Sequence, residues 1–572
     1  MKKVEGATIK HAHRFVVRRW SSIREVRRHI ALWVITMGLI LGATGLQFMW
    51  YQQSYRTIAS ASDGTYAEGV LGPVETINPI FASSSAEQSL SRLLFSQLLN
   101  YDTTGNLNYD LAEAMEISKD QKTYTVTIRP DARWQDGIYV RAKDVVFTVN
   151  LLKDPDTRAT ITGWDDITVK EVDDRTVAFT LPAVYAAFPH ALSGLPILPE
   201  HILRDVEPSA LRENSFSTNP VGSGPFSLRF IQSIDETNGR KIVHLAGNNT
   251  YYNGAAKIDR LQLHVYDSTD EIIRAITTAE VTAATDLTVT DANKLPLLRY
   301  EIERKPVSGG VYALFNTTDG VLNDKDIRKA LQVGTDTEAL RALIGPDTPA
   351  LHLPFVNGQI SGKVPAAPTY SVKKAGELLD AAGWKLTDGS RTKDGETLQL
   401  KLVTTNNNDI EKAFVGLASQ WRDLGITVTT SVIDPRDPSQ NIAQNVLKVR
   451  NYDVLVYQLT IGADPDVYAY WHSSQANGGF NFSNYDNAIS DEALQSARTR
   501  LEPDLRNAKY LTFARQWLRD APAIGLYQAT TQYVSSKSIN AIPETEVLIS
   551  ATDRYADVLY WSVGDRIVQQ TP

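Results

Sequence analysis

The chain has 572 residues, of which 42% are hydrophobic and 22% charged, and its formal charge at pH 7 is −8. This length exceeds that of a single hydrophobic core, so two or more packed lobes are expected, and the composition excludes a largely disordered chain. Cysteine is absent, which excludes disulfides, thiolate metal sites, cysteine nucleophiles and a lipid anchor on an N-terminal cysteine.

Charge is unevenly divided along the sequence. Residues 1–64 carry ten Lys or Arg and three acids, and the rest carries 48 basic and 63 acidic residues, a net −15. Phosphate binding needs clustered Lys and Arg, so nucleic acid is not an expected partner. The acidic balance favours neutral or basic solutes.

An uncharged apolar run extends from Ile30 to about Trp50, which is long enough to cross ~30 Å of hydrocarbon. Basic residues are frequent before this run, whereas Arg56 alone follows it closely, so the N-terminus should stay in the cytoplasm. The chain should then be a single-pass protein of the cell membrane, with its C-terminal domain outside the cytoplasm. The expected segments are a basic cytoplasmic segment (1–29), a transmembrane anchor (30–51) and a polar linker (52–64).

A cleaved signal peptide is the alternative, since Ala59-Ser60-Ala61 supplies a small-x-small pattern. The apolar run exceeds the ~7 to 15 residues of a usual signal core, which favours the anchor. A buried core helix is a third interpretation of this run. It is disfavoured because a core helix does not need many basic residues before it.

Strand-like and helix-like patterns alternate after the linker. Tyr124, Val126 and Ile128 alternate with threonines, which predicts a half-buried strand. A helix is predicted soon afterwards, with an apolar face that includes Val145 and Val149.

The clearest unit lies between residues 398 and 430. Leu398, Leu400 and Leu402 predict a strand, Asp409 a helix N-cap, and Gly425 the end of that helix before a second strand. Strand, helix and strand of this length imply a parallel pair, and therefore α/β construction.

Open α/β sheets bind ligands at the carboxyl ends of their strands, where Asn406, Asn407 and Asn408 follow the first strand. An ordinary polar turn is the other interpretation of these asparagines.

Motifs for catalysis or metal binding are weak in this sequence. No HExxH is present, and Gly358–Val364 (GQISGKV) lacks the glycine spacing and the Ser/Thr of a phosphate loop. Ser371 and Lys374 fit an S-x-x-K pattern, but no K-T-G follows, and Ser371 suits the N-cap of a helix over 372–382. Carboxylates are too abundant for a catalytic pair to be excluded by counting. We predict no enzyme, no metal and no cofactor, while ten Trp and 24 Tyr suit a cleft that binds a solute by shape.

Several segments, taken together and in order, identify the family that the chain resembles. They are Gly64-Thr65 with ETINP (75–79), Leu111-Ala112-Glu113, KTYTVTIRPDARWQDGIYVRAKDVVFT (122–148), NPVGSGPF (219–226), NNTYYNGAAKIDRLQLHVY (248–266), NDKDIRKALQVGTDTEAL (323–340), YSVKKAGELLDAAGW (370–384), YDVLVYQLTIGADPDVYAYW (452–471) and the region of Asn484, Tyr485 and Asp491. In this order the segments resemble the extracellular solute-binding proteins of family 5, which include dipeptide, oligopeptide and nickel binders. The resemblance spans residues 64 to about 560.

The resemblance implies a two-lobed α/β fold of the periplasmic-binding-protein type (type II, cluster C) with an inserted subdomain, and the transmembrane helix predicted from the apolar run precedes it. The implied divisions are lobe I (65–315) with the subdomain at about 100–218, lobe II (316–525), and a return to lobe I with a C-terminal tail (526–572). Two lobes of this kind close on a solute by a hinge motion.

The function implied is that of the solute-binding component of an ABC importer. Its expected partners are a peptide or other small organic solute, the ABC permease and ATPase subunits, and the membrane through the N-terminal helix. An extracellular solute sensor and an extracytoplasmic hydrolase are the alternatives.

Seven residues are candidates for contact with the solute in this implied fold. They are Asn78, Trp134, Asn406, Asn407, Tyr457, Asp464 and Trp471. The sequence departs from the peptide binders at Ile461, where the resemblance implies an aspartate that holds the peptide's amino terminus. Because a buried ammonium needs a paired carboxylate, either Asp464 or Asp466 takes that role, or the solute is not a peptide with a free amino terminus.

Overall fold

The computed structural model describes residues 20–54, 56–60, 64–235, 239–318, 320–434, 437, 439–542 and 547–569. The chain divides into two compact units, residues 1–61 with 565–572 and residues 62–564. Residues 1–19, most of the predicted cytoplasmic segment, lie outside the described residues.

The first unit contains one long helix, α2 (Trp20–Ser54), whose apolar part Val26–Trp50 is long enough to cross a membrane. The helix continues past the predicted end of the anchor, since no Gly or Pro interrupts residues 51–54. Residues Arg56–Ser60 form strand β1, antiparallel to β23 (Asp565–Gln569). The segment predicted as a linker is therefore partly helix and strand.

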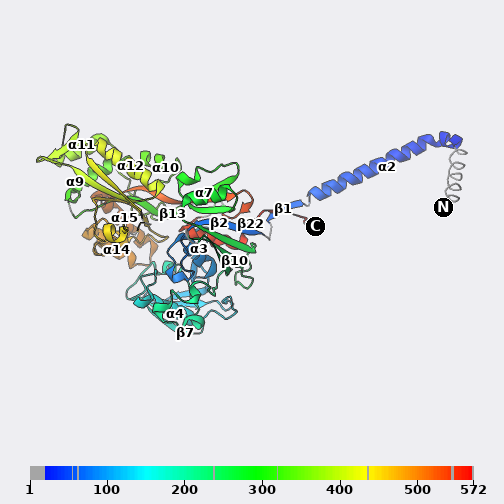
Figure 1. The fold of residues 1–572 in the computed structure, drawn as a ribbon, viewed down its shortest axis with the longest axis horizontal. Coiled ribbons are helices and arrows are strands. Elements are labelled where there is room, and N and C mark those ends of the chain that lie inside the picture. Colours follow the sequence, from blue (N-terminus) through cyan, green and yellow to red (C-terminus); the bar gives the residue numbers. More distant parts are fainter. Residues whose placement is uncertain are drawn as a thin grey trace. The chain divides into compact units, whose positions relative to one another are not determined.

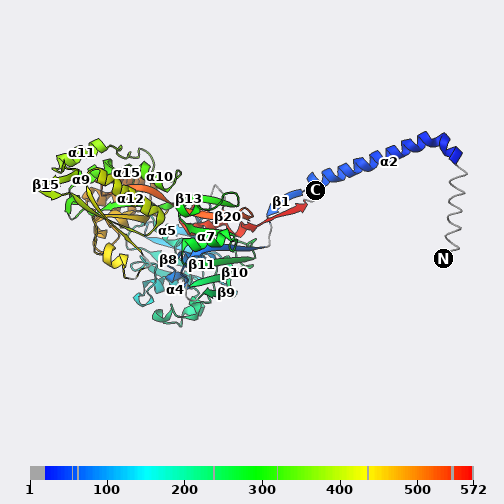
Figure 2. The ribbon, with the colours of Figure 1, turned by 45° about the horizontal axis from the view of Figure 1, so that its top comes forward.

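A mixed sheet of ten strands runs through the second unit (Figures 1 and 2). Its order is β18-β17-β19-β13-β20-β12-β2-β11-β10-β9. The strands are β2 (Thr65–Leu71), β9 (Phe226–Asp235), β10 (Arg240–Gly247), β11 (Arg260–Tyr266), β12 (Ala283–Leu287), β13 (Tyr300–Phe315), β17 (Gln399–Thr405), β18 (Thr427–Ile433), β19 (Val454–Thr460) and β20 (Ala523–Ser536).

Two long strands, β13 with 16 residues and β20 with 14, connect the two halves of this sheet. They pair antiparallel along most of their length; β12 pairs with β20 towards one end, and β19 pairs with β13 towards the other. We call the part of the unit before β13 and after β20 lobe I, and the part between these strands lobe II. The chain thus leaves lobe I, builds lobe II and returns, as the resemblance implies.

Lobe I carries a second, antiparallel sheet in the order β5-β6-β8-β7. Its strands are β5 (Ala112–Ile117), β6 (Thr123–Ile128), β7 (Thr168–Asp173) and β8 (Thr176–Thr180), and helix α4 (Ala142–Lys153) packs against β7 and β8. The predicted alternation is confirmed, because Tyr124, Val126 and Ile128 are fully buried. These side chains share one hydrophobic core with β2, β10 and β11, so the second sheet is packed on the rest of lobe I.

The remaining described elements of lobe I are short helices and strands. They are η1 (Pro79–Phe81), α3 (Ser85–Leu94), β3 (Leu99–Tyr101), β4 (Leu107–Tyr109), η2 (Pro155–Thr157), α5 (Phe188–Leu192), α6 (Glu200–Leu203), η3 (Pro208–Ala210), η4 (Ser215–Ser217), α7 (Thr269–Thr277), α8 (Val289–Ala292), β21 (Ile539–Asn540), η8 (Ala551–Tyr560) and β22 (Ser562–Val563).

In lobe II the predicted strand, helix and strand are confirmed as β17, α12 (Asn408–Asp423) and β18, with β17 and β18 parallel. Asp409 is not the N-cap of α12, as the sequence predicted. Asn407 is the cap, because its side-chain oxygen accepts hydrogen bonds from the backbone N–H groups of Asp409 and Ile410. Asp409 instead accepts hydrogen bonds from the backbone of Val289 and Thr290 in α8.

The other described elements of lobe II surround its two hydrophobic cores. They are η5 (Gly320–Asn323), α9 (Lys325–Val333), α10 (Thr337–Ile344), α11 (Val372–Ala381), β14 (Lys385–Thr387), β15 (Ser390–Lys393), β16 (Glu396–Thr397), the π-helix η6 (Ala443–Leu447), α13 (Tyr468–Trp471), η7 (Ser473–Gln475), α14 (Ala488–Arg498) and α15 (Pro503–Asp520). Ser371 caps α11 as predicted, since its hydroxyl accepts a hydrogen bond from Lys374 N–H.

The glycine-rich turn NPVGSGPF packs on the end of α3. A Cβ on Gly222 would lie 1.9 Å from the carbonyl oxygen of Leu94, and one on Gly224 would lie 2.6 Å from that of Leu93. Gly224 N–H donates to Leu94 O at 2.8 Å. Glycine at these positions therefore lets the turn approach the last turn of α3 closely.

Candidate functional site

Two of the pockets that lie between lobe I and lobe II share four lining residues. One encloses about 500 Å³ and the other about 630 Å³. Gln88, Thr460, Ile549 and Ser550 line both pockets, so the two form one continuous cleft, which we call the interlobe cleft. Its size is within the range of sites that bind small molecules.

The walls of the interlobe cleft come from segments that the large sheet positions. Gln88 is on α3 of lobe I, and Ile549 and Ser550 precede η8. Thr460 lies in lobe II at the carboxyl end of β19, where ligands bind in open α/β sheets.

Ser308, on the crossing strand β13, connects the two walls through its backbone. Its N–H donates to Ile549 O at 2.9 Å, and its carbonyl oxygen accepts a hydrogen bond from Ile461 N–H at 2.8 Å. The crossing strands thus form the part of the interlobe cleft where the lobes meet.

Lobe I and lobe II also touch at Arg498, the last residue of α14. Its guanidinium lies 4.6 Å from the ring centre of Tyr185 in lobe I and 4.5 Å from that of Tyr468 in lobe II. Its Nε is 3.1 Å from Asp466 Oδ2, and its carbonyl oxygen accepts a hydrogen bond from Ala186 N–H at 3.0 Å. Burial raises the pKa of Asp466, and the charge of Arg498 opposes this rise.

Asp464 is already paired within lobe II. Arg506 donates to both carboxylate oxygens, at 2.8 and 2.7 Å. Across the lobe boundary, His190 Nε2 is 3.8 Å from Asp464 Oδ2, and His190 Nδ1 is hydrogen-bonded to Tyr101 at 2.8 Å. Burial lowers the pKa of His190, which favours the neutral imidazole.

These pairings concern the position of Ile461, where the resemblance implies an aspartate and this chain has a buried isoleucine. Asp464 and Asp466 are the two carboxylates that could replace the missing aspartate. Each is already compensated by an arginine, Arg506 and Arg498 respectively. Neither is free to hold an ammonium group in the arrangement described.

Asn406 and Asn407 line a third pocket of about 640 Å³, and Asn407 also lines the interlobe cleft. The third pocket shares Asp286, Thr288 and Asn407 with the cleft. The oxygen of Asn407 is engaged in capping α12. Asn78 is buried beside Pro79, which lines the cleft, and its Nδ2 has no hydrogen-bond partner among the described residues.

Trp134, Trp471 and Tyr457 do not line the pockets described above. Trp134 is 0% exposed and donates to Asp144 Oδ2 at 3.3 Å within the core of lobe I. Trp471 is 1% exposed and packs edge-on against Trp517. Tyr457 is partly buried against Phe482, and burial raises the pKa of its hydroxyl. A role for any of the seven residues in binding stays a prediction.

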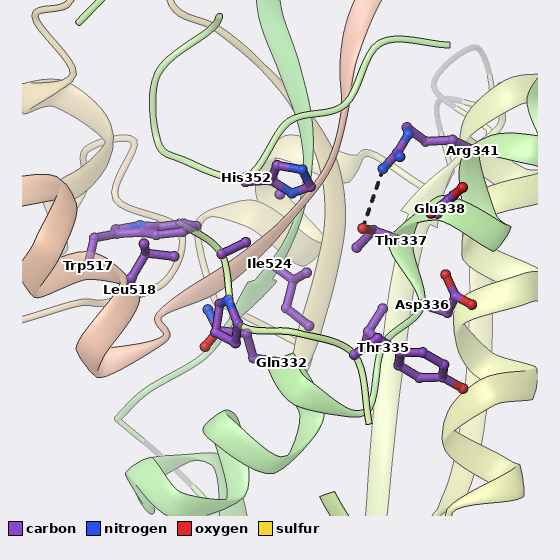
Figure 3. Close-up of a pocket in the computed structure, with 14 residues that line it drawn as sticks. Gln332, Thr335, Asp336, Thr337, Glu338, Arg341, His352, Trp517, Leu518 and Ile524 are labelled. Atoms are coloured by element: carbon purple, nitrogen blue, oxygen red, sulfur yellow. Dashed lines mark hydrogen bonds between the residues drawn. The ribbon is translucent and has the colours of Figure 1, made fainter. Parts of the chain in front are cut away.

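A smaller pocket of about 210 Å³ is lined by residues between Gln332 and Gly525 and does not lie between the lobes (Figure 3). Trp517 and Leu518 lie on one side of it, and Arg341, which donates to Thr337 Oγ1 at 3.4 Å, lies on the other. Because all its lining residues lie on the lobe II side, between positions 332 and 525, we do not consider this pocket the capture site. Across the described ranges, no group of three or more His, Cys, Asp or Glu side chains could hold a metal ion.

The sequence did not single out four residues that line the interlobe cleft or join the two lobes: Arg92, His190, Arg498 and Thr460. None lies in a motif with a chemical signature. Only Thr460 could have been found, because it follows the mostly apolar run 454–459 within the segment 452–471 that carries the resemblance.

Comparison with known proteins identifies the same family that the sequence segments resemble. The family model described as bacterial extracellular solute-binding proteins, family 5 Middle, matches residues 106–481. The oligopeptide-binding protein AppA of Bacillus subtilis (strain 168) is 26% identical over 481 residues, which cover 81% of this chain and 86% of AppA.

Solved structures show the same fold. The structure of Bacillus subtilis AppA in complex with a nonapeptide has a TM-score of 0.71 at 22% identity, covering 88% of this chain and 100% of that one. NikZ from Campylobacter jejuni, in complex with Ni(L-His), has a TM-score of 0.73 at 25% identity, covering 87% and 99%. The two-lobed fold is thus confirmed.

Proposed function

Because this chain belongs to the bacterial extracellular solute-binding proteins, family 5, we propose that it captures a peptide or related organic solute in the interlobe cleft and delivers it to an ABC permease. The relative AppA is named as an oligopeptide-binding protein, which supports a peptide as the solute. The solute is released chemically unchanged, so the protein is not an enzyme.

The observation that carries this proposal is the continuous cleft with walls from both lobes. In the part of the chain that the structure describes, two strands of the large sheet, β13 and β20, connect the lobes. A hinge at such strands lets the lobes move apart for entry and close for retention. The chemistry of the cleft is that of hydrogen-bonding groups and apolar surface, which suits binding.

We also propose that the division into lobes falls as the sequence predicted, with lobe I at 65–315, lobe II at 316–525 and the return at 526–572. All the buried residues of the two hydrophobic cores of lobe II lie between positions 311 and 527, except Val289, which belongs to lobe I. The inserted subdomain is proposed to span about 100–218, the range that holds the four-stranded sheet.

The N-terminal helix is proposed to stay attached as a membrane anchor. The 25 residues Val26–Trp50 span roughly 37 Å as a helix, against ~30 Å of hydrocarbon. Mass spectrometry of the N-terminal peptide from membranes tests this. Recovery of residues 20–50 supports an anchor, whereas a mature terminus near Ser62 shows a cleaved signal.

Capture is tested with the full chain purified in detergent and incubated with a tryptic digest of a standard protein. Retained peptides are washed, released by denaturation and identified by mass spectrometry. We expect intact peptides to be retained by the wild type and lost from Thr460→Trp, which fills the junction of the two pockets.

The matched control is Thr387→Trp, which places the same side chain on the exposed strand β14. It should retain peptides like the wild type. Equal retention by both variants, or release of cleaved peptides, would contradict the proposal.

A further inference from the structure

Arg92 is an arginine of the interlobe cleft whose side chain has no hydrogen-bond or ion-pair partner among the described residues. It is in the last turn of α3, is partly buried and lines the pocket of about 630 Å³. Its guanidinium makes no ion pair or hydrogen bond with any residue in the part of the chain that the structure describes. This differs from Arg498 and Arg506, whose charges are paired.

The carboxylates near Arg92 are engaged elsewhere. Asp110, which interacts with Arg92 only at longer range, accepts hydrogen bonds from Gln97 N–H and from the hydroxyl of Tyr252. Asp553, on the same pocket wall, accepts hydrogen bonds from the backbone and hydroxyl of Ser550.

Two more side chains of this pocket have unused hydrogen-bonding capacity. Ser91 and Gln97 line it beside Arg92, and their side chains form no hydrogen bond with other described residues. A planar guanidinium presents parallel N–H donors that match a carboxylate, and nearby hydroxyl and amide groups can complete its hydrogen bonds.

A partly buried arginine that has no carboxylate within hydrogen-bonding distance among the described residues loses solvation and gains little in return, because Asp110 compensates its charge only from a distance. The carbonyl end of α3 offers a favourable dipole, but its effect is small at a partly exposed position. A bound anion would compensate the charge more fully.

We propose that Arg92 binds a carboxylate of the captured solute and thereby selects solutes that carry one. This inference rests on the proposed function, since it names the chemical class that the interlobe cleft takes. It narrows the solute class expected from the acidic balance of the chain: a peptide with a free carboxyl terminus should bind more tightly than its amide. The pairing of Asp464 and Asp466 with arginines agrees, because neither carboxylate is free to select an ammonium group.

The test uses the full chain in detergent and a tryptic digest, half of which has every carboxyl group converted to an amide. The two halves carry different isotopic labels and are mixed before capture. The wild type should retain the free-acid peptides in roughly tenfold or greater excess, since a charge-assisted hydrogen bond of this kind is worth about 1.5–3 kcal/mol.

Arg92→Gln should lose that preference, because a neutral amide side chain makes no charge-assisted hydrogen bond with a carboxylate. Arg92→Lys, which keeps the charge, should retain part of the preference. Arg299→Gln is the control, because Arg299 is an exposed arginine of lobe I that lines none of the pockets described. Thermal melting shows whether each variant is folded.

The outcomes separate this inference from the proposed function. Equal retention of both forms by the wild type, or an unchanged preference in Arg92→Gln, overturns the role of Arg92 but leaves capture intact. A parallel loss of both forms in folded Arg92→Gln also overturns it, because a purely structural role would do this. No retention by the wild type overturns the proposed function and the inference together.

Discussion

Charged side chains in the interior of lobe I form one tightly connected group. Glu68, on β2, accepts hydrogen bonds from Arg554 Nε at 2.9 Å and from the hydroxyls of Tyr66 and Tyr555 at 3.0 and 2.9 Å. Glu68 and Arg554 are fully buried, and Arg554 also donates to Ser89 on α3. The group therefore ties the returning end of the chain to the first strand of lobe I.

Removing one member of this group should lower the free energy of unfolding strongly. Arg554→Met leaves the Glu68 carboxylate buried without its counter-charge, so we expect a loss of about 3–5 kcal/mol in the free energy of unfolding. The double variant Glu68→Gln, Arg554→Met should lose less than Arg554→Met alone. Urea denaturation followed by tryptophan fluorescence measures both.

The control for this prediction is Glu113→Gln, which removes an exposed partner of Arg175 and should cost less than about 1 kcal/mol. If Arg554→Met cost no more than this control, Glu68 and Arg554 would not act as a buried pair.

The lowered pKa of His190 predicts that the stability of the folded state depends on pH. Burial lowers its pKa in the folded protein below the ~6.5 of the unfolded chain, although Asp464 opposes this and Arg506 adds to it. The folded state then binds the proton less readily than the unfolded state. The stabilisation of the folded state that comes from this pKa difference is fully present above pH 6.5. It is lost as the pH falls from 6.5 through the lower pKa of the folded state.

The wild type should thus lose more stability between pH 7 and pH 5 than His190→Gln, which cannot be protonated. Urea midpoints at the two pH values measure the difference. The side chains that face His190 are Tyr101, Asp464 and, through Asp464, Arg506. An equal pH dependence in both proteins would show that His190 does not titrate in this way.

Elements with a local signal could be predicted from the sequence. The strand β6 and the helix α4 follow from apolar periodicity, and α11 begins at its predicted cap, Ser371. The start of α12 was misplaced by two residues, because Asn407, Asn408 and Asp409 are all good capping residues and only the backbone decides between them. Gly425 ends that helix with φ +85, as expected for its C-terminal glycine.

Elements that depend on distant residues could not be predicted. The crossing strands β13 and β20 pair residues more than 200 positions apart, and Arg554 meets Glu68 over 486 positions. The pairing of Asp464 with Arg506 is likewise a tertiary contact, so the sequence left the role of Asp464 open. The resemblance supplied the two-lobed fold, and periodicity alone would have supplied only α/β construction.

The glycine-rich turn gives a prediction at the scale of elements. Gly222→Ala places a Cβ 1.9 Å from a backbone oxygen of α3, so the turn or the helix must move. We expect a loss of at least about 3 kcal/mol in the free energy of unfolding, above the usual range for overpacking because the clash is with backbone.

Gly194→Ala is the matched control, because its nearest neighbour would be Ala191 O at 3.7 Å, an ordinary contact. Denaturation curves compare the two variants. A stable Gly222→Ala protein would mean that the turn does not pack on α3 as described.

At the scale of the whole molecule, the account depends on lobes that move relative to each other about two connecting strands. Among the described residues, the contacts that cross between them include hydrogen bonds, such as Ala186 N–H with Arg498 O and Asp409 with α8, and one apolar side chain, Val289, which packs into a core of lobe II. The hydrogen bonds can break and form again, and opening of the lobes would expose the side chain of Val289. A solute bound to both walls would add contacts that exist only in the closed form, and so shift the population towards it.

The most direct measurement is the distance between spin labels on the two lobes, by double electron–electron resonance. The chain has no cysteine, so Lys170→Cys in lobe I and Lys373→Cys in lobe II, both at exposed positions, are the only sites that react with the label. In the full chain, addition of a tryptic peptide digest should shorten and narrow the distance distribution, and Thr460→Trp should abolish the change. An identical distribution with and without peptides that are shown to be bound would contradict closure of the lobes on a captured solute.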